Sequence, residues 1–494
     1  MIRVSPKLPA IVSASGAYYL AHALLIVAGL ISMPIMTRLL SKAEYGLLGL
    51  VYLTATVFAL IGGLGFGEAA VRLYGEHLAR GAAALRDLCG TLVGGAFAAS
   101  MIVALALATI PRWIPSVASE PYLACLPLAA LLVVIRAMSG VAFQIYRAQE
   151  RAGAHALTQV GMRYGTLVVA LLILLLFRRA AFNVIVATLV VEIVALAIRL
   201  IDLGRRGVLG IPHQPRPIFR TAIAYGLPLA LAGSARFLLD YADRFMIERM
   251  LGLDAVAMYA VPYDLTAKVG DALATPIQLA AVPIIFRLWV DEGQISTSRF
   301  TSDVLNYMVA MALPIAVLYL IYSEDIIVLL ASAKYRGAGE LTPYILPGVL
   351  LGTVNFLVVV GLTVQKRTGV VAVTVCSAAA LNVLLNLILI PYWQLIGAAV
   401  ATTASYAVLL VANYYFAADA ITLRPDYGVL TKAAIATALS VLLLHQLDLL
   451  APVSAIVLVI ALLLGVLTAA VVFSVLDPRL RALVAAQVSG GSPA

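Results

Sequence analysis

Fourteen apolar runs constrain this chain more than any other feature of its sequence. Each run approaches the roughly 20 residues that an α-helix needs to cross a bilayer, and short polar connections separate them. Hydrophobic residues make up 63% of the 494-residue chain and charged residues only 12%, whereas soluble domains are roughly half apolar and a quarter charged. The sequence therefore predicts an all-α integral membrane protein with about 14 transmembrane helices.

The predicted helices follow one another closely, and no connection is long enough to form a soluble domain. The longest polar connections are Gly204–Arg216 and Asp291–Ser302. The second and eighth helices continue past the membrane as apolar, amphipathic extensions. The predicted helices are Ala10–Met36, Tyr45–Gly67, Leu88–Ile110, Tyr122–Tyr146, Leu157–Phe177, Phe182–Leu203, Phe219–Ala242, Ala255–Pro276, Val304–Tyr322, Thr342–Val364, Val370–Ile390, Ile396–Phe416, Val429–His445 and Val453–Val475.

The basic residues of the connections predict the orientation of the chain. With the N-terminus inside, 23 of the 33 Lys and Arg residues fall on the cytoplasmic side and 10 on the other. An excess of this kind marks cytoplasmic loops, so both termini are predicted to be cytoplasmic. The net charge of +9 is spread over short loops, which suits membrane orientation better than binding to nucleic acid.

A short internal repeat predicts how the helices are grouped. Ser41–Ala55 overlies Leu253–Ala267, and both end in Leu-Thr-Ala. The repeat unit is six helices, an even number, so the two halves are predicted to be parallel repeats about an axis along the membrane normal. The predicted parts are a six-helix bundle in residues 1–203, a cytoplasmic linker in 204–218, a second six-helix bundle in 219–417, and two additional helices with a cytoplasmic tail in 418–494.

Ionisable residues lie inside several of the apolar runs. Two sets have the spacing i, i+4, i+7, which places their members on one helix face. A charge at the bilayer centre costs roughly 2.5–3.5 kcal/mol, so these faces are predicted to meet protein or water. The sets are Arg236, Asp240 and Asp243, with Arg244 beside them, and Asp264, Lys268 and Asp271; Arg72, Arg136 and Arg163 are further candidates in the first half.

These charges have a functional and a structural interpretation. In the functional interpretation, the charges form the wall of a cavity in which cations outweigh acids. Such a cavity would suit a phosphate or diphosphate group, which guanidinium groups bind with paired hydrogen bonds. Alternatively, Arg72, Arg199 and Arg244 snorkel from helix ends, and Asp240 and Asp243 form a salt-bridge cluster with Arg244. Lys268 lies well inside its helix, which favours function there.

Signatures of nucleotide, metal or covalent chemistry are absent from the sequence. It contains no GxxxxGK[ST], no HExxH, and no glycine fingerprint after a strand. The three cysteines lie in apolar runs without CxxC spacing. We therefore predict no enzymatic activity, no metal and no cofactor, and leave open coupling to H⁺, to Na⁺ or to the membrane potential.

Two stretches resemble helix signatures of polysaccharide-exporting flippases. These flippases are the O-antigen and exopolysaccharide translocases of the multidrug/oligosaccharidyl-lipid/polysaccharide exporter superfamily. The resemblance implies a MATE-like, V-shaped plan of two six-helix bundles with two further C-terminal helices. The stretches are AYGLPLALAGS (Ala224–Ser234) continued by LLDYADRFMIERMLGLDAVAMYAVPYDL (Leu238–Leu265), and TRLLSKAEYGLLGL (Thr37–Leu50).

The resemblance also implies a function and partners. The family moves an undecaprenyl-diphosphate-linked oligosaccharide from the cytoplasmic to the periplasmic leaflet of the bacterial inner membrane, by alternating access, for lipopolysaccharide or exopolysaccharide biosynthesis. Membrane lipids, a polysaccharide polymerase and glycosyltransferases are the implied partners. The family's cationic lumen would correspond here to Arg236, Lys268, Arg136 and Arg163.

Two other functions compete with this one. A cation-coupled multidrug exporter of the same superfamily would favour an acidic pocket, and the Arg and Lys content argues against it. A membrane polysaccharide polymerase or ligase typically has a large periplasmic loop, and the periplasmic loops predicted here are short.

Overall fold

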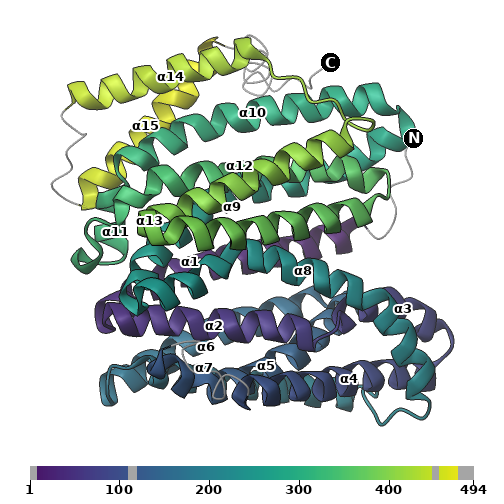
Figure 1. The fold of residues 1–494 in the computed structure, drawn as a ribbon. Coiled ribbons are helices and arrows are strands. Elements are labelled where there is room, and N and C mark those ends of the chain that lie inside the picture. The colour runs from purple at the N-terminus through teal and green to yellow at the C-terminus, as the bar shows by residue number, and fades with distance from the viewer. Residues whose placement is uncertain (1–7, 110–118, 448–454, 477–494) are drawn as a thin grey trace. The chain divides into compact units, whose positions relative to one another are not determined.

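The computed structural model describes residues 8–109, 119–447 and 455–476, and every regular element in these ranges is helical (Figure 1). The predicted all-α membrane fold is confirmed. Its elements are α1 (Leu8–Leu39), α2 (Lys42–Gly62), α3 (Phe66–Ala79), α4 (Ala82–Thr109), α5 (Glu120–Ala148), α6 (Ala152–Leu176), α7 (Ala181–Arg205), α8 (Pro215–Leu251), α9 (Leu253–Asp291), α10 (Gln294–Ile321), α11 (Ser323–Leu330), the 3₁₀ turns η2 (Ala333–Tyr335) and η3 (Ala338–Leu341), α12 (Thr342–Val364), α13 (Thr368–Ala417), α14 (Tyr427–Gln446) and α15 (Ala455–Leu476).

Twelve helices of the described ranges are long and apolar enough to cross a membrane. Two further segments bring this number to the predicted fourteen. One is α1, which is 32 residues long. The other arises because α13, with 50 residues, is two helices joined at a kink at Gln394. Ile110, Val453 and Ser454, at the ends of two predicted helices, lie outside the described residues, as does the tail after Leu476.

The two arms of α13 form a hairpin with almost no connecting loop. Gln394 turns the chain with φ +49° and ψ −128°. Buried hydrogen bonds then link the arms: Thr374 Oγ1 donates to Asn413 Oδ1 over 2.7 Å, and Asn382 Nδ2 donates to Thr402 Oγ1 over 3.2 Å. Polar side chains in an apolar environment must find such partners, so these pairs fix the register of the hairpin.

The chain divides into two compact units, Met1–Ala257 and Met258–Ala494. In the first unit, α5 packs against α2, α3, α4 and α7, while α8 packs against α2, α3 and α4. The core between α3, α4 and α5 is apolar and includes Phe66, Leu88, Leu92 and Ile145, all fully buried. These two units are defined by compactness alone. The predicted division into two six-helix bundles therefore stays a prediction.

A break between α2 and α3 corrects the end of the second predicted helix. The sequence predicts one helix over Tyr45–Gly67, but α2 ends at Gly62 and α3 begins at Phe66. Leu64 and Gly65 between them have positive φ angles of 47° and 69°. Gly65 also lies so close to Gly226 of α8 that a Cβ on either residue would collide with the carbonyl oxygen of the other. Glycine is required at both positions, because any side chain would separate the two backbones.

In the second unit, α12 packs against α13, and α10 packs against α12, α14 and α15. The last two helices, α14 and α15, also pack against each other. Fully buried Ile285 and Leu357 belong to one apolar cluster, and Leu318 and Leu444 join α10 to α14 in another. The helices that follow the second predicted bundle are therefore packed onto α10.

Candidate functional site

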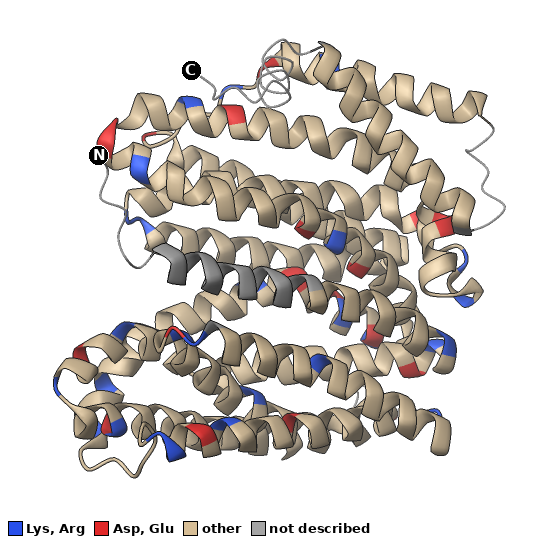
Figure 2. Cartoon of the chain, turned by 180° about the vertical axis from the view of Figure 1, so that it is seen from behind, with Lys and Arg blue, Asp and Glu red and all other residues tan. Residues whose placement is uncertain are grey.

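The i, i+4, i+7 set on α9 lies on the more open side of its helix. Figure 2 shows long stretches of helix without charge, with a few acidic and basic residues among them. On the opposite side of α9, buried Thr266 forms a hydrogen bond with the Tyr319 hydroxyl of α10 over 3.0 Å. This contact orients the helix, so that Asp264 and Lys268 are half-buried and Asp271 is exposed.

Lys268 is the cation at the centre of this set. Its Nζ donates to the backbone carbonyl oxygen of Asp264 over 3.3 Å, within the same helix. An ammonium group offers three donors, so this contact leaves capacity for an anionic ligand. Lys268 thus lies on the same helix face as Asp264 and Asp271, and its role in binding an anion stays a prediction.

We expect this face of α9 to be wetted, and thiol labelling checks it. In a background without the native cysteines, of which Cys376 is exposed, Cys in place of Lys268 or Asp271 should react with a membrane-impermeant thiol reagent. Two controls should stay unreactive: Ala260→Cys because Ala260 is buried, and Leu463→Cys because this 67% exposed residue lies on α15, which carries no charged residue, and would face lipid. Equal protection at all four positions would exclude a cavity wall.

The set on α8 divides into an exposed part and a buried part. Arg236 Nε donates to Asp240 Oδ2 over 3.2 Å, and their side chains are 43% and 23% exposed. One turn further, Asp243 is fully buried and Arg244 is 4% exposed. These residues share one face of α8, as predicted, but that face is partly open at Arg236 and Asp240 and becomes buried at Asp243.

The buried part of α8 has the contacts of a structural cluster. The Arg244 guanidinium lies 4.9 Å from the centre of the Tyr241 ring. Nearby, the carboxylate of buried Glu248 accepts a hydrogen bond from the backbone N–H of Ser119 over 2.9 Å. Snorkelling does not describe Arg244, nor Arg199 of α7, which is fully buried, donates to Ser139 Oγ and stacks on Phe143.

Arg136 of α5 is engaged by its own unit. Its Nε and Nη2 both donate to Glu192 of α7, with the shortest contact at 3.0 Å. Its Nη1 donates to the Tyr52 carbonyl and to Thr56 Oγ1 of α2. This arginine thus ties three helices together. Its acidic partner Glu192 is itself a lone acid in an otherwise apolar run, which is the sequence signal that points to it.

The other two candidates of the first unit are more open. Arg163 of α6 is exposed, and its Nη2 is 3.5 Å from Ser32 Oγ of α1. Arg72 of α3 is exposed and lies 4.7 Å from the centre of the Tyr225 ring. Neither has an acidic partner within the described part of the chain, so their positive charges remain available to an anion.

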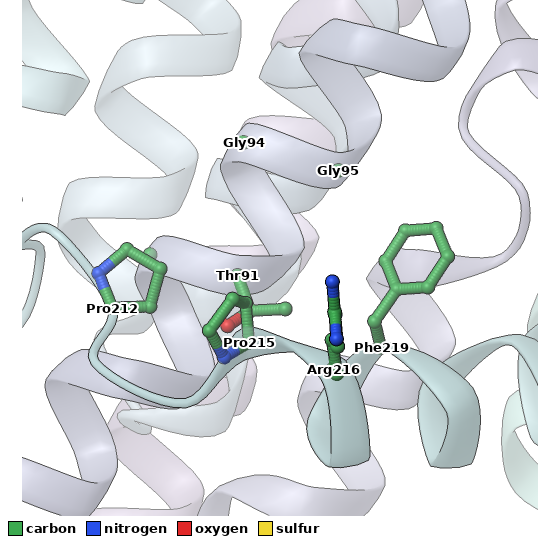
Figure 3. Close-up of a pocket in the computed structure, with 8 residues that line it drawn as sticks. Thr91, Gly94, Gly95, Pro212, Pro215, Arg216 and Phe219 are labelled. Carbon is green, nitrogen blue, oxygen red and sulfur yellow. The ribbon is translucent and has the colours of Figure 1, made fainter.

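A pocket of about 320 Å³ lies in the first unit beside the start of α8. Arg216 and Phe219 rise from the first turns of α8 toward the part of α4 that carries Gly94 and Gly95 (Figure 3). None of the ten predicted site residues lines it. Its one charged lining residue, Arg216, belongs to the basic connection that the sequence assigns to the cytoplasmic side.

A sequence comparison assigns the family. The model of the polysaccharide biosynthesis protein family matches residues 13–289, which is more than half of the chain. The chain belongs to this family. All ten candidate residues of this polysaccharide biosynthesis protein fall within the matched range. The predicted family is confirmed, and the many apolar helices support a multi-pass membrane protein.

One curated relative is the uncharacterized membrane protein MJ1068 of Methanocaldococcus jannaschii, which is 24% identical over 201 residues. That match covers 41% of this polysaccharide biosynthesis protein and only 40% of the relative. Because the relative is itself uncharacterized, it supports the class of protein and adds no activity.

Solved structures share the fold. The lipid II flippase MurJ, in an inward closed conformation, matches with a TM-score of 0.65 at 12% identity, over 94% of this chain and 98% of that one. An inward-facing multidrug resistance MATE family transporter of the MOP superfamily matches with a TM-score of 0.63 at 15% identity, over 80% and 93%. A MOP superfamily transporter from Pyrococcus furiosus matches with a TM-score of 0.55 at 14% identity, over 83% and 95%. The predicted MATE-like fold is thereby confirmed.

Proposed function

We propose that this polysaccharide biosynthesis protein is a flippase for an undecaprenyl-diphosphate-linked oligosaccharide. It would carry the lipid-linked glycan from the cytoplasmic to the periplasmic leaflet of a bacterial inner membrane by alternating access, for lipopolysaccharide, O-antigen or exopolysaccharide biosynthesis. Both termini would be cytoplasmic. Its partners would be the lipid-linked glycan, membrane lipids, a polymerase and glycosyltransferases.

The observation that carries this proposal is the half-buried Lys268 on a 39-residue helix of the transporter fold. A diphosphate group cannot cross hydrocarbon cheaply, since a charge at the bilayer centre is costly. A fixed cation on a helix face lowers that cost, and the neighbouring carboxylates of Asp264 and Asp271 stabilise it before the substrate arrives. In the other unit, the half-buried Arg236 of α8 is a second candidate cation, whose Nε donates to Asp240 Oδ2.

Deletion of the gene in its host tests the function directly. We expect loss of the surface glycan and accumulation of the lipid-linked oligosaccharide at the cytoplasmic leaflet, both reversed by a plasmid copy. The readouts are glycan staining of whole cells and mass spectrometry of extracted lipids. If the deletion strain instead keeps its glycan and becomes sensitive to cationic drugs, the multidrug exporter is the better description.

A further inference from the structure

A polar ladder on α10 holds the segment that leads into α14. Ser298 Oγ accepts from the N–H of Thr422 over 3.1 Å, and Ser302 Oγ accepts from the N–H of Arg424 over 3.1 Å. Asn306 pairs twice, donating to the Arg424 carbonyl and accepting from the N–H of Asp426. Because the three side chains recur every four residues on one face of α10, they fix the segment along the helix.

A pocket of about 650 Å³ opens between α10 and this segment. Arg299 of α10 and Arg424 of the segment both line it, and both are exposed. Among the described residues, neither guanidinium group has a hydrogen-bond or ion-pair partner. Two acids, Asp303 and Asp426, line the same pocket. Asp426 also caps α14, since its Oδ1 accepts from the N–H groups of Gly428 and Val429.

The pocket lies where the two bounding helices become apolar. On α10 the long apolar run begins at Val304, and on α14 it begins at Ala433, directly after Lys432. Both α10 and α14 are long and apolar enough to cross a membrane. Two exposed residues also line the pocket: Ile295, which is 79% exposed, and Tyr427, which is 76% exposed. An exposed tyrosine beside a membrane span is typical of the interfacial layer. The pocket is therefore placed at the depth of lipid headgroups.

We propose that this pocket binds the headgroup of a phospholipid of the phosphatidylethanolamine class. The two guanidinium groups would bind the phosphate oxygens, for which Arg is well suited. The carboxylates of Asp303 and Asp426, each with several acceptor sites, would face the ammonium group. A headgroup with a negative charge and no amine would meet these two acids unfavourably. The volume is within the range of ligand pockets, roughly 300–1,000 Å³.

Native mass spectrometry of the full-length protein tests the pocket without any transport assay. Phosphatidylethanolamine, phosphatidylglycerol and inorganic phosphate are each added to the purified protein. We expect phosphatidylethanolamine to bind about tenfold more tightly than phosphatidylglycerol, and Arg299→Gln/Arg424→Gln to lose most of that binding, since a hydrogen bond to a charged group is worth about that factor.

Arg287→Gln is the matched control, because Arg287 is also exposed in the second unit, on α9, but does not line the pocket. It should bind the lipid as the wild type does. The double variant should keep the wild-type unfolding temperature, since neither guanidinium group has a partner among the described residues. Equal lipid binding by the double variant overturns the site. The proposed headgroup class is wrong if the protein prefers phosphatidylglycerol, or if inorganic phosphate binds as tightly as the lipid.

Discussion

Lys268→Ala and Arg236→Ala should each reduce glycan export about tenfold or more while membrane abundance stays normal. Each substitution removes a cation that the proposed mechanism uses to bind the diphosphate. A hydrogen bond between charged groups is worth about 1.5–3 kcal/mol, which corresponds to roughly 10–100-fold. Abundance should hold because neither side chain belongs to the packed interior: Lys268 is half-buried and Arg236 is 43% exposed.

The assay is restoration of surface glycan in the deletion strain, with membrane abundance measured by immunoblot. Lys268→Arg and Arg236→Lys should keep part of the activity, because they keep the charge. Arg287→Ala, an exposed cation elsewhere on α9, is the matched control and should export normally. Full export by both alanine variants would mean that these cations are structural, and Arg163 and Arg72 would become the next candidates.

Arg136→Ala and Glu192→Ala should each lower the membrane abundance of the protein several-fold. The Glu192 side chain is 9% exposed and Arg136 22%, so either substitution leaves the other charge wholly or partly buried without its partner. Breaking a buried ion pair costs roughly 3–5 kcal/mol, which is a large part of typical protein stability. Lost packing between α2, α5 and α7 would add to this cost.

A double variant separates structure from function at this pair. Arg136→Met/Glu192→Leu removes both charges and keeps apolar volume, so abundance should recover to near wild type. Export by that variant then decides the role of Arg136. Normal export would make the pair structural, whereas lost export at normal abundance would return Arg136 to the substrate pathway. If both single alanine variants accumulate normally, the pair does not stabilise the protein.

The helices were predictable because the bilayer imposes a length on every apolar run. The kinked α13 illustrates this, since Val370–Ile390 and Ile396–Phe416 are separate runs in the sequence and separate arms in the structure. The end of α2 was not predictable from hydropathy. Residues Gly62–Gly67 are apolar or small, and the break there depends on the close approach of Gly226, which is remote in sequence.

The sequence predicted which candidate residues share a helix face, but not how deeply each side chain is buried. Helical spacing places Arg236, Asp240 and Asp243 on one face, yet only the structure reveals that α8 is packed around Asp243 and open around Arg236. The sequence also did not predict which charged residues pair between helices. Arg136 and Glu192 are 56 residues apart, and local periodicity carries no information about such a contact.

The hairpin of α13 has a consequence for how the chain enters the membrane during synthesis. Asn382, Asn386, Thr402 and Asn413 are all buried in it. Asn386 donates to Asn382 within the first arm, but either arm alone would enter hydrocarbon without the bonds from Asn382 to Thr402 and from Thr374 to Asn413, which is costly. With Gln394 as a tight turn between them, the arms can leave the insertion machinery side by side, with the two bonds between the arms already formed. The translocon would then handle α13 as a single unit, and the Asn and Thr residues would help insertion rather than hinder it.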